Sequence, residues 1–386
     1  MDVKELAIEK HREWKGKIEV ISRTPIQTKE QLSIAYTPGV AAPCLEIAKD
    51  PGKVYDFTRR GNLVAVITDG TAVLGLGDIG PEAAMPVMEG KCALFKEFAD
   101  VDAIPLCVNS KDPDEIVRTI ELIGLSFGGI NLEDISAPRC FEIEQKLKER
   151  LPIPVFHDDQ HGTAIIVGAA VINSAKLIGK PLQELEIVIN GAGAAGIAIA
   201  KFLMLLGVGN LILCDIHGIL APGAEGMNPA QEHMAQITNR DRRTGSLADA
   251  MVGADVFIGV SKPNMVTPAM IQSMNDKPVI FAMANPVPEI MPDEALAAGA
   301  YIVGTGRSDF PNQINNVLAF PGIFKGALRA RARDITDEMK VGAAYGIAGI
   351  IPEEELRPDY ILPDPFHPAV AENVARAVEN AVKREA

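Results

Sequence analysis

Two pairs of adjacent acidic residues are the first candidates for chemistry in this sequence. Glu133 and Asp134 follow a short apolar run that opens with glycine, and Asp158 and Asp159 follow a second short apolar run after one histidine. If both runs are strands of one parallel sheet, the acids share its carboxyl edge, where open α/β sheets bind ligands. Four carboxylates there repel one another unless a cation lies among them, and all-oxygen ligands favour Mg²⁺ or Mn²⁺. The alternative is that Glu133 or Asp158 caps the following helix.

A second metal pattern overlaps the second acidic pair. The segment from His157 to His161 echoes the HExxH signature of zinc hydrolases, which needs both imidazoles on one helix face. His157 comes directly off an expected strand and Gly162 follows His161, so we expect no full helical turn here. The sequence therefore gives little support to zinc hydrolysis.

Two further side chains have the chemistry to move protons. Lys91 has apolar neighbours in an expected helix over 81–98, and burial would lower its pKa and make it a usable base. Tyr36 lies in a segment rich in proline and glycine, from which a phenol can project into a cleft. Taken alone, a solvated lysine and a packing aromatic are the simpler interpretations.

A glycine-rich turn predicts a dinucleotide site. Gly191, Gly193 and Gly196 have the GxGxxG spacing between an expected strand and an expected helix, whose N-terminus offers N–H donors to a pyrophosphate. Asp215 ends the next strand, where a carboxylate accepts from a ribose 2′-hydroxyl and disfavours a 2′-phosphate. The carboxylate therefore favours NAD over NADP, although the basic side chain of His217 could offset its charge. The alternative interpretation is a glycine-rich turn that binds no cofactor. The expected cofactor-binding residues are Gly191, Ala192, Gly193, Ala194, Ala195, Gly196 and Asp215.

Apolar strands alternating with helical stretches predict an α/β fold that positions these residues. We expect an N-terminal α/β domain over 1–157, which carries Tyr36, Lys91 and the first acidic pair, and a Rossmann-type dinucleotide-binding domain with C-terminal helices over 158–386. Residues 1–60 are expected to form one helix and an extended, loop-rich arm. Expected strands are 63–68, 103–108, 129–132, 154–156, 186–190, 210–214, 256–260, 279–282 and 301–303. Expected helices are 5–17, 81–98, 113–123, 140–151, 162–177, 197–206, 323–339 and 369–383, with a loop at 352–368.

Composition narrows the classes of partner. The 386 residues carry a net charge of −14, which repels phosphate backbones and anionic lipids and argues against nucleic-acid or membrane-surface binding. We see no run of about 18 apolar residues and no apolar signal core at the N-terminus. Five scattered cysteines without a CxxC pair fit reduced thiols, so we expect a cytoplasmic protein.

Several segments together resemble the malic enzyme family in its short bacterial and archaeal form. They follow the family's order from about residue 30 to about residue 330. The matching segments are Tyr36-Thr37-Pro38-Gly39-Val40, Thr68-Asp69-Gly70 with Leu74-Gly75-Leu76-Gly77-Asp78, Gly90-Lys91, Asn131-Leu132-Glu133-Asp134, 157–163, 191–196, Asn285-Pro286 and Asn315-Asn316-Val317.

The resemblance implies oxidative decarboxylation of L-malate to pyruvate and CO₂, with NAD or NADP and a divalent metal, Mg²⁺ or Mn²⁺. The metal ligands that it implies are Glu133, Asp134 and Asp159. It further implies Lys91 as general base, Asp158 as the acid beside that lysine, and Tyr36 as general acid. Asn285 and Asn315 match residues that contact substrate or the nicotinamide end of the cofactor.

One departure and two alternatives accompany the resemblance. Larger family members carry an arginine just before the glycine-rich turn at 74–78, whereas Ala72 stands at the matching place here, so we expect another group to hold the substrate carboxylate. The alternative functions are those of a malolactic enzyme, which releases lactate, and of a catalytically silent dinucleotide-binding protein.

We expect a homodimer, because the N-terminal arm has little core of its own. Tyr36 would then serve either the site of its own subunit or that of the partner.

Overall fold

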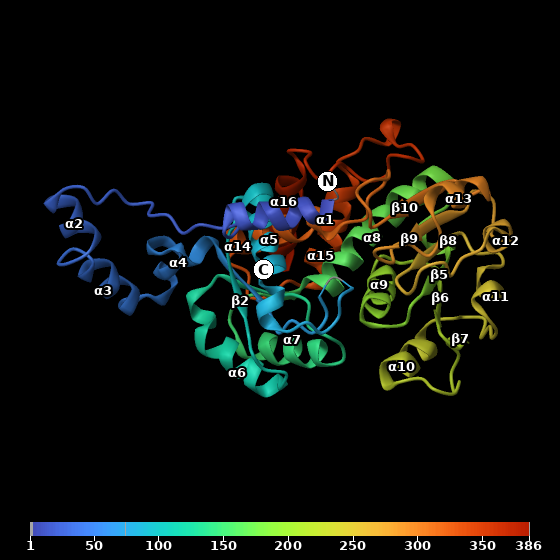
Figure 1. Cartoon of the computed structure of the whole chain (residues 1–386), viewed down its shortest axis with the longest axis horizontal. Coiled ribbons are helices and arrows are strands. Elements are labelled where there is room, and N and C mark those ends of the chain that lie inside the picture. The colour runs from blue at the N-terminus through green and yellow to red at the C-terminus, as the bar shows by residue number, and fades with distance from the viewer. Residues whose placement is uncertain (1–2, 74, 386) are drawn as a thin grey trace.

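The chain folds around two sheets, as the alternation of strands and helices predicts (Figure 1). The computed structural model describes residues 3–73 and 75–385. The first sheet has the order β2-β1-β3-β4, and all its pairings are parallel. Its strands are β1 (Leu63–Thr68), β2 (Asp102–Cys107), β3 (Gly129–Leu132) and β4 (Val155–His157).

Helices bury both faces of the first sheet, because alternate side chains of a strand point to opposite sides. Val64 and Val66 of β1 belong to the core cluster that contains Phe95 of α5. Ile67 belongs instead to a second cluster with Ile120 of α6 and side chains of α7. The covering helices are α5 (Pro81–Ala99), α6 (Pro113–Ile123), followed by η3 (Gly124–Ser126), and α7 (Arg139–Arg150).

The second sheet has the order β10-β9-β8-β5-β6-β7, with only β7 antiparallel to its neighbour. The strand order reverses at β5, and ligands of open α/β sheets bind at the crevice that such a reversal creates. Its strands are β5 (Glu186–Asn190), β6 (Asn210–Asp215), β7 (Gly218–Ile219), β8 (Val256–Gly259), β9 (Val279–Ala282) and β10 (Ile302–Thr305). Its helices are η4 (Leu182–Glu184), α9 (Ala194–Leu205), α10 (Pro229–Ile237), α11 (Leu247–Met251), α12 (Pro268–Gln272) and α13 (Pro292–Ala297).

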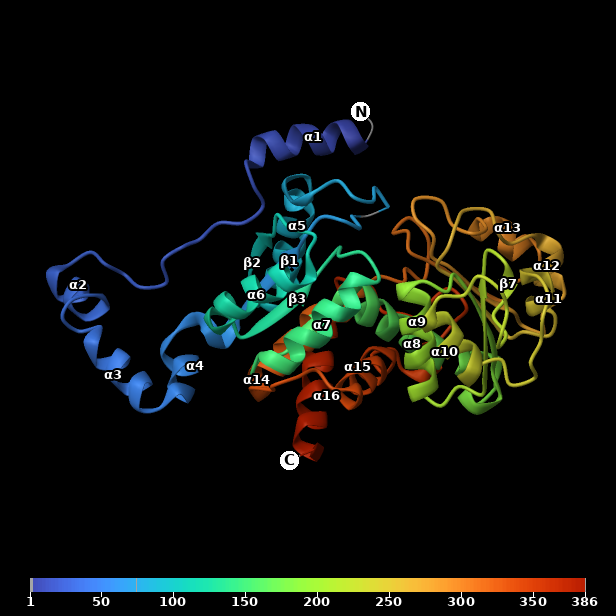
Figure 2. The same ribbon diagram turned by 90° about the horizontal axis from the view of Figure 1, so that it is seen from below.

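A single long helix, α8 (Asp158–Ile178), joins the two sheets and lies between them (Figures 1 and 2). By length and composition alone α8 could cross a membrane, although we expected no apolar run of that length from the sequence. In the fold, however, 72% of its most apolar window is buried inside the protein, against α9 and the C-terminal helices. Its apolar composition is therefore accounted for by packing in the core.

The C-terminal helices return to the first sheet. The rings of Phe320 and Phe324 lie edge-on to Phe95 of α5, with centroid distances of 4.8 and 5.4 Å. The expected single helix over 323–339 is wrong: Arg331, in the left-handed region at φ 50°, ends one helix, and Thr336 caps the next. The elements are η5 (Asn316–Leu318), α14 (Phe320–Ala330), α15 (Asp337–Ala348), η6 (Glu353–Glu355) and α16 (Val370–Glu385).

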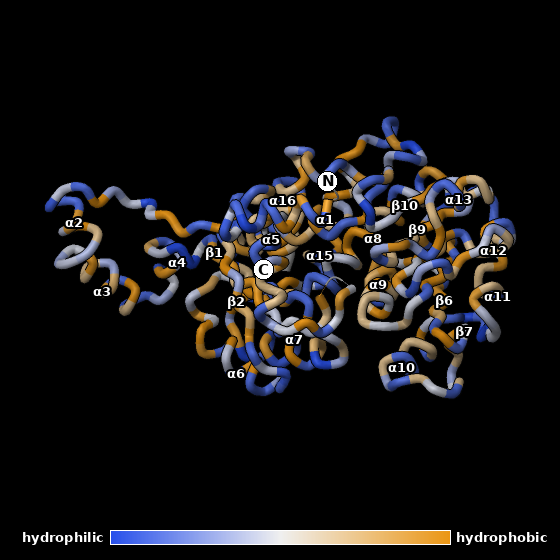
Figure 3. The backbone as a smooth tube through the Cα atoms, viewed as in Figure 1, coloured by the Kyte–Doolittle hydropathy of each residue, from blue (hydrophilic) through white to orange (hydrophobic). Residues whose placement is uncertain are grey.

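The N-terminal arm projects away from both sheets at α2 and α3 (Figures 1 and 2), but Lys17, which follows α1, donates to Glu89 and Pro86 of α5. It is more helical than we expected, but none of its helices α1–α4 contains a buried residue. Ile21, Ile34 and Leu45 are 70, 69 and 62% exposed, and Figure 3 shows hydrophobic colour along this part of the tube. Its helices are α1 (Val3–Trp14), α2 (Lys29–Ala35), α3 (Ala41–Lys49), η1 (Pro51–Lys53), α4 (Val54–Phe57) and η2 (Arg59–Asn62).

The packing of α14 on α16 makes a prediction about stability. A Cβ atom at Gly326 of α14 would lie 2.5 Å from the Ala375 carbonyl oxygen of α16. We expect Gly326→Ala to lower the free energy of unfolding by about 1–3 kcal/mol, because the two helices must separate. At Gly90, within α5, a Cβ would meet only Lys17 Nζ at 4.0 Å, an ordinary contact, so Gly90→Ala is the matched control and should stabilise by about 0.5–1 kcal/mol. Equal effects in urea denaturation would contradict this assignment.

Candidate active site

Lys91 is the centre of a buried charge cluster at the carboxyl edge of the first sheet. It projects from the middle of α5, and its Nζ lies 2.6 Å from Asp158 Oδ2 and 2.8 Å from Glu133 Oε1. Glu133 follows β3 directly, and Asp158 is the first residue of α8, directly after β4. The parallel pairing of β3 with β4 therefore brings the two acids to one place, as the sequence indicates.

The ammonium of Lys91 is held charged by these acids. Burial lowers its pKa, but attraction to Asp158 and then Glu133 outweighs burial and raises the pKa above its ordinary value. The expectation of a lowered pKa is therefore wrong: the side chain is buried as expected, but its acidic partners contribute more than burial does. Nζ also lies 4.1 Å from the centroid of the Phe320 ring, a further favourable contact for a cation.

Three carboxylates beside Lys91 form a group with the chemistry of a divalent-metal site. Glu133, Asp134 and Asp159 each place one oxygen within 4.8 Å of the others. Burial raises the pKa of Glu133 and of Asp158, each to about 7, and attraction to Lys91 offsets only part of this rise. An all-oxygen donor set with excess negative charge fits Mg²⁺ or Mn²⁺. These are the three metal ligands that the resemblance implies.

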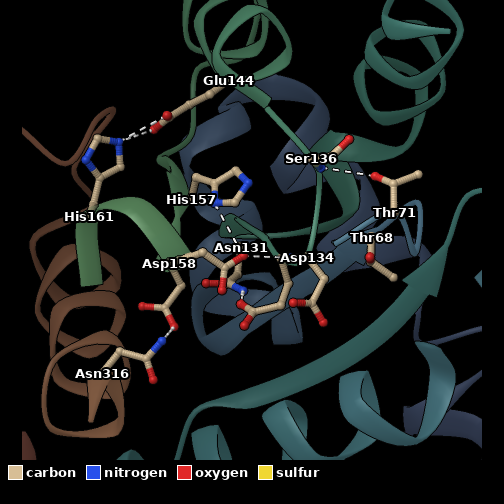
Figure 4. A network of polar contacts seen from close by, with 12 residues as sticks. Thr68, Thr71, Asn131, Asp134, Ser136, Glu144, His157, Asp158, His161 and Asn316 are labelled. Atoms are coloured by element: carbon tan, nitrogen blue, oxygen red, sulfur yellow. Dashed lines mark hydrogen bonds and ion pairs between the residues drawn. The ribbon is translucent and has the colours of Figure 1, made fainter. Parts of the chain in front are cut away.

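Amide side chains orient the acids, and sequence reasoning missed them. Asn131 Nδ2 donates to Glu133 Oε2 at 2.9 Å, and Asn316 Nδ2 donates to Asp158 Oδ2 at 2.6 Å (Figure 4). Asn315, the expected substrate residue, also caps η5, where its Oδ1 accepts from the Val317 N–H. The sequence signal for this contact was the adjacent pair Asn315 and Asn316, but spacing alone does not show which of the two contacts Asp158.

The two histidines do not form a zinc site with the acids. Contrary to our expectation, the segment is helical from Asp158 onward. His161 lies on that helix, turned toward Glu144 of α7, with Nε2 2.8 Å from its carboxylate (Figure 4). His157 is buried, and burial lowers its pKa to about 4, so the imidazole is neutral. Its Nδ1 lies 3.8 Å from Asp159 Oδ2, too far for a hydrogen bond.

Tyr36 is placed apart from this cluster. It follows α2 directly, at the far end of the arm in both views of the ribbon, and 67% of its surface is exposed (Figures 1 and 2). The structure thus brings Lys91, Asp158 and the three acids together within one chain, but it does not bring Tyr36 to them.

A crevice of about 390 Å³ opens at the glycine-rich turn, separate from the charge cluster. A Cβ at Gly191, where φ is 118°, would lie 2.6 Å from the Val260 carbonyl oxygen, and one at Gly196 would overlap the Gly191 carbonyl. A Cβ at Gly193 would meet open space, which leaves the backbone free to approach a phosphate. Asp215 lines the crevice, as expected, beside the uncharged amide of Gln231, which sequence reasoning did not single out.

Asn285 lies on an exposed loop after β9 that a buried acid holds in place. The two carboxylate oxygens of Glu289, which is fully buried, accept from the N–H groups of Ser261 and Ala284 at 3.0 Å each. The carbonyl of Asn285 lies near Gly75 of the glycine-rich turn that precedes α5. This loop therefore meets the first sheet's unit, where a cofactor and a substrate would face each other.

The loop around Ala72 contains no arginine of its own, but Arg139 of α7 reaches it. Its Nη2 lies 2.9 Å from Asp69 Oδ2 and donates to Thr71 Oγ1 at 2.9 Å, and its Nη1 donates to the Lys111 carbonyl. The N–H of Ala72 donates to the Asp134 carbonyl at 3.0 Å. Arg139 thus fixes this loop against the segment that carries a metal-ligand candidate.

The metal assignment can be tested by binding alone. We expect Glu133→Gln to weaken Mn²⁺ binding at least about tenfold, because one anionic ligand becomes neutral. The measurement is the loss of the free-Mn²⁺ electron paramagnetic resonance signal as protein is added. Asp78→Asn, which neutralises an exposed acid paired with Lys111, is the matched control and should bind as the wild type does. Equal affinities in both variants would contradict the assignment.

Comparison with known proteins agrees with this geometry. The family model "Malic enzyme, N-terminal domain" matches residues 15–148, and "Malic enzyme, NAD binding domain" matches residues 160–386. The chain is 56% identical to a bifunctional malic/malolactic enzyme of Bacillus subtilis, over 99% of this chain and 93% of that protein. It is 51% identical to a probable NADP-dependent malic enzyme of Rickettsia prowazekii, over 96% of this chain but only 50% of that protein.

A solved structure shows the same arrangement. The NAD-dependent malic enzyme of Thermotoga maritima superposes with a TM-score of 0.92 at 50% identity, covering 97% of this chain and 98% of that one. Two family models together match most of the chain, and the relatives are similar over nearly its whole length. The chain belongs to the malic enzyme family.

Proposed function

We propose that this protein oxidises and decarboxylates L-malate to pyruvate and CO₂ while reducing NAD. The observation that carries the proposal is the Lys91–Asp158–Glu133 cluster, which adjoins a three-carboxylate group. The dinucleotide crevice supplies the second half of the reaction, because hydride removed from C2 of malate needs an acceptor. Family membership supports the same substrate.

The protein's own side chains carry out the proton transfers of the proposed reaction. Lys91, oriented by Asp158, takes the C2-hydroxyl proton as hydride leaves for the nicotinamide. Loss of CO₂ leaves the enolate of pyruvate, whose C3 takes a proton from Tyr36, and Lys91 then returns its proton to Tyr36. Malate and NAD⁺ thereby become pyruvate, CO₂ and NADH with no net proton gained or lost. Glu133, Asp134 and Asp159 would hold a divalent cation, which would supply Lewis-acid polarisation of the C2 oxygen and offset the negative charge that keeps Lys91 protonated.

Asp215 supports a preference for NAD. Its carboxylate faces the crevice where the adenosine ribose is expected, and Gln231 beside it adds no positive charge to attract a 2′-phosphate. The unpaired cysteines fit a reducing cytoplasm, where we place the protein.

Lactate formation is the second candidate function, because a relative at 56% identity is named a bifunctional malic/malolactic enzyme. The two reactions share every residue assigned above up to the loss of CO₂. They differ in whether the hydride is returned to the three-carbon product.

The proposed reaction predicts equal amounts of NADH and pyruvate. NADH absorbance is followed with L-malate and Mn²⁺, with NADP in a parallel reaction, and pyruvate and lactate are assayed at the end. We expect NAD to be used faster than NADP. Lys91→Ala should lower turnover by about 10²–10⁴-fold without changing NADH binding by fluorescence, whereas Lys277→Ala, on the surface, should leave both unchanged. Lactate without NADH would favour the malolactic reaction, and no turnover would contradict both.

We further propose a homodimer in which the arm of each subunit delivers Tyr36 to the partner's site. The support is the exposed apolar side chains of the arm and the distance of α2 from the sheets in Figures 1 and 2. Burial of such side chains is the usual driving force for association.

This arrangement predicts complementation between two inactive variants. Tyr36→Phe and Lys91→Ala subunits carrying different affinity tags are co-expressed, and the mixed dimer is purified through both tags. With Tyr36 acting across the interface, one of its two sites is intact, so we expect about half of the wild-type turnover per dimer. With Tyr36 acting within its own subunit, neither site is intact, and a mixed dimer as inactive as the two parent dimers would contradict the proposal.

A further inference from the structure

Asp134, one of the three metal-ligand candidates, has a backbone conformation that is uncommon for a residue with a side chain. Its φ is 53°, in the left-handed region, and the residue is 4% exposed. In this conformation one of its carboxylate oxygens lies within 4.8 Å of those of Glu133 and Asp159. A residue other than glycine keeps such a conformation where its surroundings determine it. The neighbours of Asp134 therefore decide whether the three oxygens stay together.

Hydrogen bonds hold the backbone of this segment on both sides of Asp134. The N–H of Asp134 donates to Asp159 Oδ2 at 2.8 Å, and its carbonyl accepts from the N–H of Ala72 at 3.0 Å. Two residues further on, the N–H of Ser136 donates to Thr71 Oγ1 at 3.0 Å (Figure 4). Two of these three bonds are made by Thr71 and Ala72, so the position of their loop determines the position of Asp134.

Arg139, the first residue of α7, holds that loop through a buried acid. The side chain of Asp69 is fully buried, and its Oδ1 accepts from the N–H and the hydroxyl of Thr71 at 3.1 and 2.6 Å. Arg139 Nη2 lies 2.9 Å from Asp69 Oδ2, and it donates to Thr71 Oγ1 at 2.9 Å and to Ser136 Oγ at 3.1 Å. Among the residues that the structure describes, no other cation pairs with Asp69. Arg139 therefore neutralises the buried acid and joins its loop to the segment after Asp134.

We propose that Arg139 is a positioning residue for the divalent cation. By fixing Asp69 and Thr71, it keeps Asp134 in the conformation that brings its carboxylate to the other two ligands. Both terminal nitrogens of Arg139 are bonded to protein groups, Nη1 to the Lys111 carbonyl at 2.7 Å, so the guanidinium acts through the loop. This inference deepens the proposed function, because it rests on the metal group that the reaction needs.

The sign of the effect distinguishes positioning from simple electrostatics. By Coulomb attraction alone, removal of a positive charge near the site would strengthen the binding of a divalent cation. If Arg139 holds Asp134 in place, its removal weakens binding instead, because Asp69 is left buried without its counter-charge and the loop must shift to hydrate it.

Titration of the full-length protein with Mn²⁺, followed by electron paramagnetic resonance, measures this effect. We expect Arg139→Gln to raise the Mn²⁺ dissociation constant about tenfold, and Arg139→Lys, which keeps the charge that Asp69 needs, to restore part of the affinity. Arg118→Gln removes an exposed arginine paired with Glu121 and is the matched control, with binding as in the wild type. NADH binding by fluorescence should be unchanged in all variants, because none of these residues lines the dinucleotide crevice. Thermal unfolding verifies that each variant is folded.

A second variant tests the same connection without changing any charge. Thr71→Val removes the hydroxyl that links Arg139 to the N–H of Ser136, and we expect it to weaken Mn²⁺ binding about fivefold. In the Thr71→Val background, Arg139→Gln should have a smaller further effect than in the wild type, because both act through one network. If Arg139→Gln does not fold, the affinity of Thr71→Val decides.

Mn²⁺ affinity that is unchanged or higher in folded Arg139→Gln, or unchanged in Thr71→Val, would overturn the proposal. An equal loss of NADH binding would also overturn it, because it would show a general loss of structure. Glu133→Gln in the same titration separates this inference from the metal assignment. If Glu133→Gln also binds Mn²⁺ as the wild type does, the metal assignment has failed, whereas if Glu133→Gln alone weakens binding, only the role of Arg139 has failed.

Discussion

The burial of one ammonium among four carboxylates is the constraint on which the rest of this structure depends. Charges taken out of water must be paired, and Lys91 is paired with Asp158 and Glu133 at hydrogen-bond distances. The three residues come from α5, from the end of β3 and from the start of α8. The sheet order, the packing of α5 and the position of Asn316 therefore all determine whether these charges meet. The excess negative charge is what makes the same place suitable for a divalent cation.

The helix α8 connects this cluster to the cofactor crevice. It starts with two acids of the cluster and then packs along α9, whose first residue belongs to the glycine-rich turn. The strand reversal at β5 places that turn at the carboxyl edge of the second sheet, and the loop fixed by Glu289 returns toward the first unit. In the proposed mechanism a substrate bound at the acids faces a cofactor bound at the turn, and in the proposed homodimer the arm delivers Tyr36 to the partner's site.

Much of the fold was predictable, because strands with β-branched apolar runs and helices with regular apolar spacing signal themselves locally. The acids at the strand ends and the glycine-rich turn were predictable for the same reason. What could not be predicted depended either on contacts between elements distant in sequence or on the conformation of a single residue. The raised pKa of Lys91 depends on two acids from other elements. The helix break at Arg331 depends on one residue in the left-handed region, which the spacing of apolar residues in the sequence does not reveal. The choice between Asn315 and Asn316 depends on how η5 is oriented.

The fate of the C2 hydrogen of malate tests the central claim most directly. In a reaction of L-malate deuterated at C2 with NAD and Mn²⁺, the account predicts NADH that carries the deuterium and pyruvate that does not, in equal amounts. Mass spectrometry of both products measures this in a single experiment. Deuterium recovered in lactate would show that the hydride is returned to the product. Unchanged malate would contradict the assignment of Lys91 and its acidic partners to catalysis.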